Sequence, residues 1–340
     1  MNLKTKIIAT IGPKTSSPEM LSKLIENGMN IARINFSHCS HENYVIFRNN
    51  ILSEASKHGK TVKILQDLQG PRIRVGKLPE EGVKMNAGDT IIFSTDKNCE
   101  TGKIFVDDPY LHADMKVGEP IFLVNGIIEL VVKSINGNEI QAEVIRGGTL
   151  FSRKAVNVPH TKLTATGPTE KDLDDVRFAL SVGVDLIGVS FVQTAKDIER
   201  LREVVGSKAK IIAKIETAVG LKHIDEIIRA SDGIMIARGD LGIEIPVEQV
   251  PFVQKNLIRH AAWHGKPSIV ATQMLFSMVD NAHPTRAEVS DISNAVWDGA
   301  SAVMLSDETA SGNYPVESIQ AMTRIVKQAE NYHYDRASNL

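Results

Sequence analysis

Residues 210–240 read KIIAKIETAVGLKHIDEIIRASDGIMIARGD, and the patterns within them predict the fold class of the chain. Two short β-rich runs, residues 210–216 and 232–238, stand on either side of a segment with helical spacing. A strand, a helix and a second strand in this order are typical of a parallel sheet, because the helix returns the chain to the end where the first strand began.

The same alternation continues in both directions from this stretch. Further strands are predicted at residues 6–12, 31–37, 62–68, 185–192, 267–273 and 301–306. Helical spacing separates them, as in residues 18–28 and in residues 170–182, where acidic residues enrich the first turn. Eight strands, each followed by a helix, predict an α/β fold, a closed (β/α)₈ TIM barrel.

Residues 72–156 interrupt this alternation. They carry turn signals at short spacing (PEEG, NAGD, INGN, IRGG) and alternating segments such as IIFS and FLVNGIIELVV. The pattern predicts a small antiparallel β-rich domain inserted after the third strand, which divides the chain into residues 1–71, 72–156 and 157–340. The insertion takes 85 residues and leaves 255, and a (β/α)₈ barrel typically needs about 250.

Composition excludes several classes of protein. Lys and Arg number 39 against 41 Asp and Glu, a formal net charge of −2, which argues against a globally basic nucleic-acid binder. No apolar run approaches the roughly 20 residues of a membrane helix, and the first residues lack the apolar core of a secretory signal. Cys39 and Cys99 form no CxxC pair. We therefore expect a cytoplasmic protein that binds neither nucleic acid nor a membrane.

Polar residues stand at the predicted strand ends, where the chemistry of a (β/α)₈ barrel gathers. On the second strand, Arg33, Asn35 and Ser37 alternate and so share one face. A single polar residue in such a place is more simply explained as a loop cap, but six strands ending this way predict a site. The main polar residues at the other strand ends are Asp67, Lys214, Glu216, Asp240 and Thr272.

The charges among these residues favour phosphoryl transfer. Glu216 and Asp240 offer hard oxygen ligands, and Mg²⁺ typically takes one or two carboxylates plus water and substrate oxygens. Arg33 and Lys214 add the positive charge that phosphoryl transfer needs on its transferring oxygens. The alternative interpretation of Lys214 and Glu216 is an ion pair within one strand, but a buried pair of that kind is weak evidence for stability. The chain has no GxxxxGK[ST] and no GxGxxG after a strand, so P-loop and Rossmann sites are unsupported.

A series of motifs runs through the chain from residue 5 to about residue 316: TKIIATIGPKTSS, ARINFSH, DLQGPRIRVG, KAVNVP, TEKD, GVDLIGVSFV, IIAKIE, IMIARGDLGIEIP, ATQML, PTRAEVSDISNAVWDGASAVML and ETASGNYP. In these motifs and in their order, the chain resembles the pyruvate kinase family over nearly its whole length. The resemblance implies a (β/α)₈ barrel with a β-rich lid inserted after the third strand. It also implies that the phosphoryl group of phosphoenolpyruvate is moved to ADP in glycolysis, giving pyruvate and ATP, and that the chain forms a homo-oligomer through the barrel.

The resemblance also implies a role for each matching residue. Arg33 would contact the phosphoryl group, and Lys214 would stabilise its transfer and the enolate oxygen. Glu216 and Asp240 would hold Mg²⁺. The Gly239 backbone and Asp240 would lie against the substrate, with Thr272 positioning the substrate carboxylate near the path of proton delivery. The positions implied to contact nucleotide or transferring phosphate are Asn35, His38, Arg74 and Lys154.

The resemblance also implies a K⁺ site, at which this chain departs from the family in one residue. The family holds K⁺ at the positions of Asn35, Ser37, Asp67 and the Leu68 backbone, beside a glutamate that is replaced here by Arg72. We expect the Arg72 guanidinium to pair with Asp67 and to supply the charge that K⁺ otherwise brings. K⁺ is therefore expected to be possible but not required.

Two further departures and two alternative functions stay open. The lid has Val124-Asn125-Gly126 where the family often has Asp-Asp-Gly, and the chain stops at Leu340, where most members continue into a C-terminal regulatory domain. A short form lacking that domain is therefore expected. The alternatives are a Mg²⁺-dependent lyase or aldolase using a pyruvate enolate, and a weakly catalytic binding or regulatory homologue. Reaction direction and nucleotide preference do not follow from the sequence.

Overall fold

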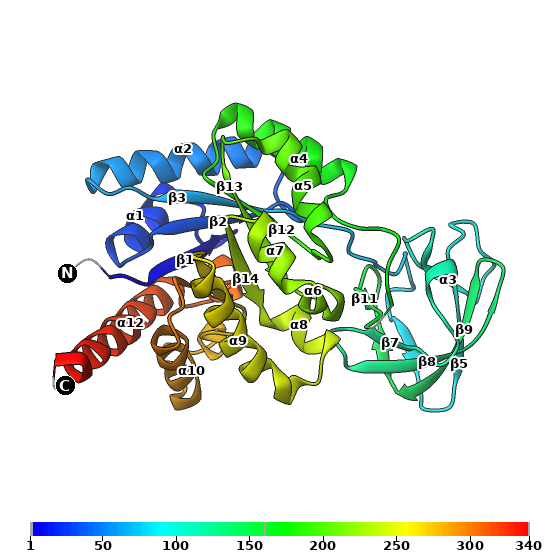
Figure 1. The fold of residues 1–340 in the computed structure, drawn as a ribbon. Helices are drawn as coiled ribbons and strands as arrows, with labels where there is room; N and C mark the ends of the chain where they lie inside the picture. The colour runs from blue at the N-terminus through cyan, green and yellow to red at the C-terminus, as the bar shows by residue number, and fades with distance from the viewer. Residues whose placement is uncertain (1–2, 160, 339–340) are drawn as a thin grey trace.

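Eight parallel strands close into a barrel in a computed structural model that describes residues 3–159 and 161–338 (Figure 1). The order around the barrel is β1-β16-β15-β14-β13-β12-β3-β2. The strands are β1 (Lys6–Ile11), β2 (Ile31–Asn35), β3 (Lys63–Asp67), β12 (Leu186–Val189), β13 (Lys210–Ile215), β14 (Gly233–Ala237), β15 (Ser268–Ala271) and β16 (Ala302–Leu305). The predicted (β/α)₈ barrel is confirmed.

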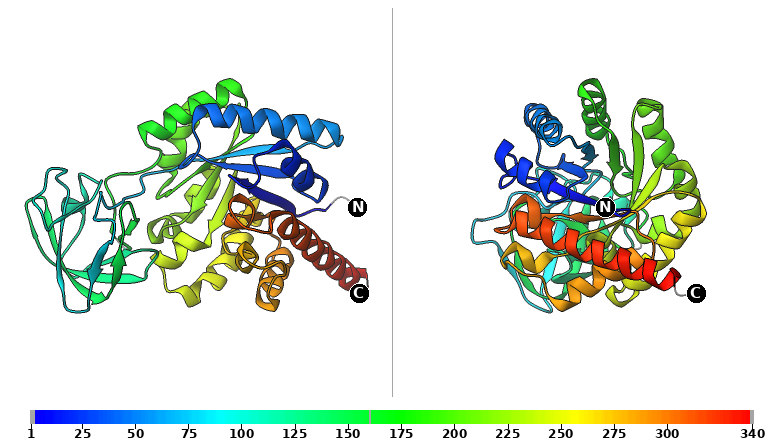
Figure 2. Two further views of the ribbon diagram at one scale, coloured as in Figure 1. Left: turned by 180° about the vertical axis from the view of Figure 1, so that it is seen from behind. Right: turned by 90° about the vertical axis from the view of Figure 1, so that its left-hand side faces the viewer.

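Helices surround the barrel, as the view along its length in Figure 2 shows. They are α1 (Pro18–Glu26), α2 (His41–Lys57), α4 (Glu170–Val182), α5 (Ala195–Val205), α6 (Ala218–Lys222), α7 (Ile224–Ala230), α8 (Arg238–Glu244), α9 (Val250–Trp263), α10 (Arg286–Trp297), α11 (Asp307–Ala310) and α12 (Pro315–Ser338). Two short 3₁₀ helices, Val247–Gln249 and Phe276–Val279, join them. No helix among the described residues has the length and apolar character needed to cross a membrane.

Local chemistry explains where these elements begin and end. Helix α4 covers the predicted residues 170–182 because Thr169 and Asp172 form a reciprocal capping box at its start. Helix α1 ends two residues before its predicted end, and Gly28 follows with a φ of 124°, which a right-handed helix does not accept. Strand β2 ends at Asn35 rather than at residue 37, because the Asn35 side chain accepts a hydrogen bond from the Ser37 N–H.

Two layers of apolar side chains hold the barrel. The alternate residues that point inward form a core inside it, and the residues that point outward pack against the helices. The inner core contains Ile8, Ile31, Leu65, Ile212, Met235, Ile269, Ala271, Ala302 and Met304. The interior is therefore a packed layer, and inward-facing residues beyond it on each strand lie at the mouth of the barrel.

The insertion between β3 and β12 forms a β-rich body at the opposite end of the molecule from the start of β1 and the end of α12 (Figure 1). Its elements are β4 (Val83–Met85), β5 (Thr90–Ser94), β6 (Ile104–Phe105), α3 (Leu111–Asp114), β7 (Pro120–Leu123), β8 (Ile128–Asn136), β9 (Glu139–Arg146), β10 (Gly148–Leu150) and β11 (Val156–Asn157). It has a hydrophobic core of its own, with members from Ile73 to Val158. The pairing is antiparallel except between β5 and β6, which run parallel.

Candidate active site

The register of the barrel brings charged residues together at its mouth. Ile31, Leu65 and Ile212 belong to the inner core. Two residues further along the same strands, and so on the same inward face, come Arg33, Asp67 and Lys214. The sequence predicted polar residues at these strand ends, and the structure places these three in direct contact.

Asp67 is the centre of this cluster. Its side chain is 1% exposed, and its carboxylate accepts from Arg33 Nε at 2.6 Å and lies 3.0 Å from Lys214 Nζ. Burial alone would raise the pKa of Asp67, but the charges of Lys214 and Arg33 outweigh burial and hold that pKa below its ordinary value. Arg33 NH1 also donates to Thr10 Oγ1 at 3.0 Å, which fixes the guanidinium on its other side.

Lys214 links Asp67 to Glu216. Its Nζ lies 3.0 Å from Glu216 Oε1 and donates to Ser190 Oγ at 2.7 Å. Burial would lower the pKa of Lys214, but the carboxylates of Asp67 and Glu216 outweigh it and raise that pKa. The ion pair between Lys214 and Glu216, which sequence analysis held as the alternative interpretation, is present as one part of a larger buried network of alternating charge.

Glu216 lies just beyond β13 and is almost completely buried. Its Oε2 accepts a hydrogen bond of 2.7 Å from the Phe191 N–H. Burial raises the pKa of Glu216, and the negative charge of Asp240 raises it further. A cation placed between the two carboxylates would relieve that repulsion.

Asp240 lies in the first turn of α8. It forms an ion pair with Arg72, whose guanidinium also lies over the Phe191 ring at 5.5 Å from the ring centroid. The expected pairing of Arg72 with Asp67 is therefore wrong. Asp67 is already held by Arg33 and Lys214, and Arg72 pairs with Asp240 instead.

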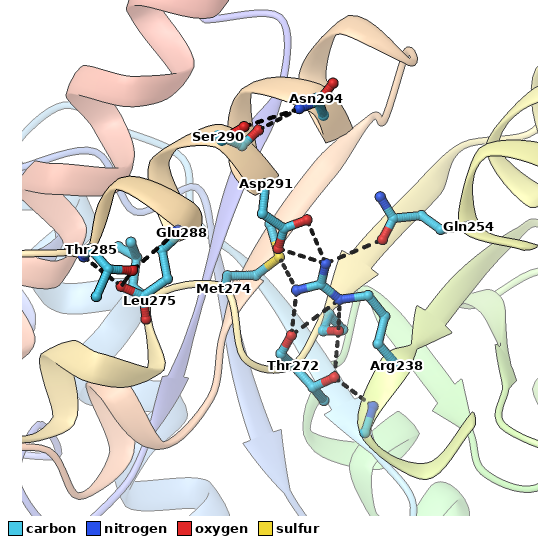
Figure 3. A network of polar contacts seen from close by, with 12 residues as sticks. Arg238, Gln254, Thr272, Met274, Leu275, Thr285, Glu288, Ser290, Asp291 and Asn294 are labelled. Atoms are coloured by element: carbon cyan, nitrogen blue, oxygen red, sulfur yellow. Dashed lines mark hydrogen bonds and ion pairs between the residues drawn. The ribbon is translucent and has the colours of Figure 1, made fainter. Parts of the chain in front are cut away.

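Thr272 follows β15 and has a φ of 70°, which is a strained conformation for a β-branched residue. Arg238 maintains this backbone, because its guanidinium donates to the Thr272 carbonyl at 2.7 Å and to Asp291 at 2.7 and 2.9 Å (Figure 3). The Thr272 hydroxyl in turn accepts from the Gly239 N–H at 2.8 Å. The two predicted substrate-contacting residues are thus joined across neighbouring strand ends.

Three of the four candidate K⁺ ligands, Asn35, Asp67 and Leu68, are engaged with other groups of the protein. The Asn35 side-chain oxygen accepts from Ser37 N, and the Leu68 carbonyl accepts from Ser190 Oγ at 2.6 Å. The Asp67 carboxylate forms ion pairs with the side chains of Arg33 and Lys214.

The candidate nucleotide-contacting residues are more dispersed. His38 and Lys154 are exposed, and Arg74 NH1 donates to the Arg153 carbonyl on the inserted body. None of the contacts recorded for the described residues ties Arg74 or Lys154 to the cluster around Lys214.

The mouth of the barrel offers a donor set that fits Mg²⁺. Within residues 3–159 and 161–338, no group of three or more His, Cys, Asp or Glu side chains is arranged to hold a metal ion. Mg²⁺ does not need one, since it accepts one or two carboxylates and fills its other positions with water and substrate oxygens. Glu216 and Asp240 are two such carboxylates, and the charge of Asp240 acts on Glu216 and raises its pKa.

Sequence analysis missed three residues that build this site. Ser190 receives a hydrogen bond from Lys214, Phe191 holds Glu216 through its N–H, and Thr10 holds Arg33. Ser190 and Thr10 each lie within or just after a predicted strand, so their polarity was an available signal. Phe191 acts through its backbone N–H at a φ of 56°, and the residue type alone does not predict this conformation.

Comparison with known proteins agrees with this geometry. Residues 2–319 match the family model described as pyruvate kinase, barrel domain. A pyruvate kinase of Geobacillus stearothermophilus is 45% identical over 337 residues, which are 97% of this chain and 57% of that protein. Pyruvate kinases of Agrobacterium vitis and Thermococcus litoralis are 44% and 43% identical over 98% and 97% of this chain, and over 70% of their own lengths. This chain therefore spans little more than half the length of the first of these relatives. The chain belongs to the pyruvate kinase family.

Proposed function

We propose that this protein transfers the phosphoryl group of phosphoenolpyruvate to ADP and so forms pyruvate and ATP. The observation that carries the proposal is the buried chain of alternating charges from Arg33 through Asp67 and Lys214 to Glu216. Phosphoryl transfer is catalysed mainly by positioning and by neutralising charge on the moving oxygens, and this network holds two cations in fixed places for that purpose. Family membership supports the same activity.

Arg33 and Lys214 would bind the transferring phosphoryl group from two sides. Both are held by Asp67, so neither side chain must be ordered when the substrate arrives. Lys214 would also stabilise negative charge on the enolate oxygen as the phosphoryl group leaves. Mg²⁺ held by Glu216 and Asp240 would supply positive charge to the substrate oxygens.

Thr272 and Gly239 would position the substrate carboxylate. The Gly239 N–H already donates to the Thr272 hydroxyl, so these two groups lie within 2.8 Å of each other at the mouth. Thr272 also donates to the Ala271 carbonyl, and a hydroxyl that both donates and accepts is suited to a path of proton delivery to the enolate carbon.

Nucleotide would bind between the barrel and the inserted body. The candidate contacts are Asn35 and His38 on the barrel side and Arg74 and Lys154 on the inserted body. Closure of the inserted body as a lid would exclude water, which competes with ADP for the phosphoryl group.

K⁺ would not be strictly required. Asn35, Asp67 and Leu68 already have protein partners, and Arg72 brings a permanent cation where the family has a glutamate.

The chain would also form a homo-oligomer through its barrel. Phe252 and Trp263 are 70% and 86% exposed, and their spacing of 11 residues places them on one face of α9. Light scattering of the purified protein should give the mass of a dimer or larger, and Phe252→Ser with Trp263→Ser should lower it.

Pyruvate formation tests the proposed activity against its alternatives. The purified protein is supplied with phosphoenolpyruvate, ADP and Mg²⁺, and pyruvate is measured through its reduction by lactate dehydrogenase. Turnover that needs all three components supports the proposal. Aldol chemistry of a pyruvate enolate without ADP would instead identify a lyase, and binding without turnover a regulatory homologue.

A further inference from the structure

Arg72 pairs with a candidate metal ligand and also lines an empty space. It reaches Asp240 through one terminal nitrogen, NH2, and its Nε–H is buried without a hydrogen-bond partner among the residues that the structure describes. The side chain borders a cavity of about 40 Å³ between the barrel and the inserted body. A water molecule needs about 10–15 Å³ measured in this way, so a side chain that already lines this space has room to move within it.

The same cavity is lined by two hydrogen-bond acceptors that have a weak donor or none among the described residues. Asn157, at the end of β11, is 7% exposed, and its side-chain oxygen has no partner within the described part of the chain. Glu244, at the end of α8, accepts only a long hydrogen bond of 3.3 Å from the Ala218 N–H and forms no ion pair with a described cation. Burial, together with the charges of Asp240 and Glu216, raises the pKa of Glu244 to about 7, as expected of a carboxyl without a positive neighbour.

Helix geometry places the two carboxylates within reach of one guanidinium. Asp240 and Glu244 stand four residues apart on α8, and side chains with this spacing lie about 5–6 Å apart on one helix face. Arg72 contacts the first of them and shares a cavity with the second. A rotation of one flexible side chain exchanges the partners without movement of either domain.

We propose that Arg72 is a positioning residue with two alternative places, on Asp240 when the divalent metal is absent and in the cavity with Asn157 and Glu244 when the metal is bound. The inference rests on the proposed function only in taking Asp240 as a metal ligand. A divalent ion carries twice the charge of a lysine or arginine side chain, so its repulsion of a guanidinium on the same carboxylate favours the place of Arg72 in the cavity. Because Asn157 belongs to the inserted body and Glu244 to the barrel, the second place of Arg72 ties the two bodies together when the metal is present.

Binding of Mn²⁺ measured by electron paramagnetic resonance, without substrate or nucleotide, tests the first place. Arg72→Gln removes the competing charge and is expected to lower the dissociation constant of Mn²⁺ by tenfold or more. Arg74→Gln is the matched control, because it removes one neighbouring positive charge that donates to Arg153 and not to Asp240. It should change that constant less than threefold. Equal effects of the two variants, or none from Arg72→Gln, would overturn the proposal.

A double-mutant cycle tests the second place. Glu244→Gln keeps the size and the acceptor of the side chain but removes the negative charge that receives Arg72. It should weaken Mn²⁺ binding about three- to tenfold in the parent and leave it unchanged in Arg72→Gln, because the displaced guanidinium is then absent. The same weakening in both backgrounds would overturn the second place of Arg72.

One further variant separates this proposal from the proposed function. Asp240→Asn should abolish tight Mn²⁺ binding in every background. If it does not, the ion is held elsewhere, and the assignment of Asp240 as a metal ligand fails together with this inference. If it does, while Arg72→Gln behaves as the parent, the inference alone fails.

Discussion

Replacement of Lys214 by methionine removes one charge from the centre of the buried network while keeping most of the side-chain volume. Lys214 Nζ donates to Ser190 at 2.7 Å and lies 3.0 Å from both Asp67 and Glu216. In the variant, Asp67 keeps Arg33, whereas Glu216 keeps only the Phe191 N–H.

The structure sets the size of both expected effects. Breaking a buried ion pair costs about 3–5 kcal/mol when the remaining charge has no other partner. Here Arg33 still neutralises Asp67, and Glu216, whose pKa is already raised, takes up a proton, so a loss of about 1–3 kcal/mol in the free energy of unfolding is expected. Turnover should fall further, by 10²- to 10³-fold, which is about 2.7–4 kcal/mol of transition-state stabilisation.

Turnover of phosphoenolpyruvate and ADP, urea denaturation and Mn²⁺ binding should be measured on the same preparation. Lys210→Met is the matched control, because it lies on the same strand, is 69% exposed and is 3.5 Å from Asp232. An exposed pair of this kind contributes about 0–1 kcal/mol, and this variant should keep its turnover. A folded Lys214→Met protein that retains more than a tenth of the parent's turnover would refute the assigned role.

Three further variants or conditions have defined outcomes. In tetramethylammonium buffer with saturating Mg²⁺, added K⁺ should raise the turnover of the parent less than tenfold, and Arg72→Glu should create K⁺ dependence. A gain of tenfold or more in the parent would contradict this prediction. Asp291→Asn should lower turnover about tenfold with Mn²⁺ binding unchanged, because Arg238 loses the carboxylate that holds it against Thr272; unchanged turnover would exclude this support. The raised pKa of Glu244 means that the folded, metal-free protein holds the Glu244 proton more tightly than the unfolded chain does. The contribution of this proton to the free energy of unfolding is therefore full below pH 4.5 and is lost as the pH rises through about 7. As the pH rises from 5 to 8, the parent should lose about 2–3 kcal/mol of its free energy of unfolding in urea denaturation, and Glu244→Gln should not show this loss. The same difference in stability between the two proteins at pH 5 and at pH 8 would contradict this.

The barrel was predictable because its strands and helices carry strong local patterns. Each short β-rich run and each helical segment repeats in order, and capping residues such as Thr169 mark the helix starts. The predicted strands are one to four residues too long, and turn-forming contacts such as that of Asn35 with the Ser37 N–H end the pairing earlier.

Much of the site was predictable for a similar reason. Side chains two apart on a strand share a face, so Arg33, Asp67 and Lys214 were expected at one mouth from strand position alone. The partner of Arg72 was not predictable, because a long flexible side chain can reach several carboxylates that are distant in the sequence. Only the packed structure shows that Asp67 is already paired with Arg33 and Lys214. The role of Phe191 was also hidden, since it acts through its backbone.

Phosphorus NMR of the purified protein with phosphoenolpyruvate, ADP and Mg²⁺ tests the central claim most directly. The phosphoenolpyruvate resonance should disappear as the resonances of ATP grow in equal amount. Without ADP, the phosphoenolpyruvate resonance should persist, because a positioned phosphoryl group and an excluded water leave it no acceptor. Unchanged phosphoenolpyruvate in the presence of ADP, or release of inorganic phosphate in its absence, would contradict phosphoryl transfer at the mouth of this barrel.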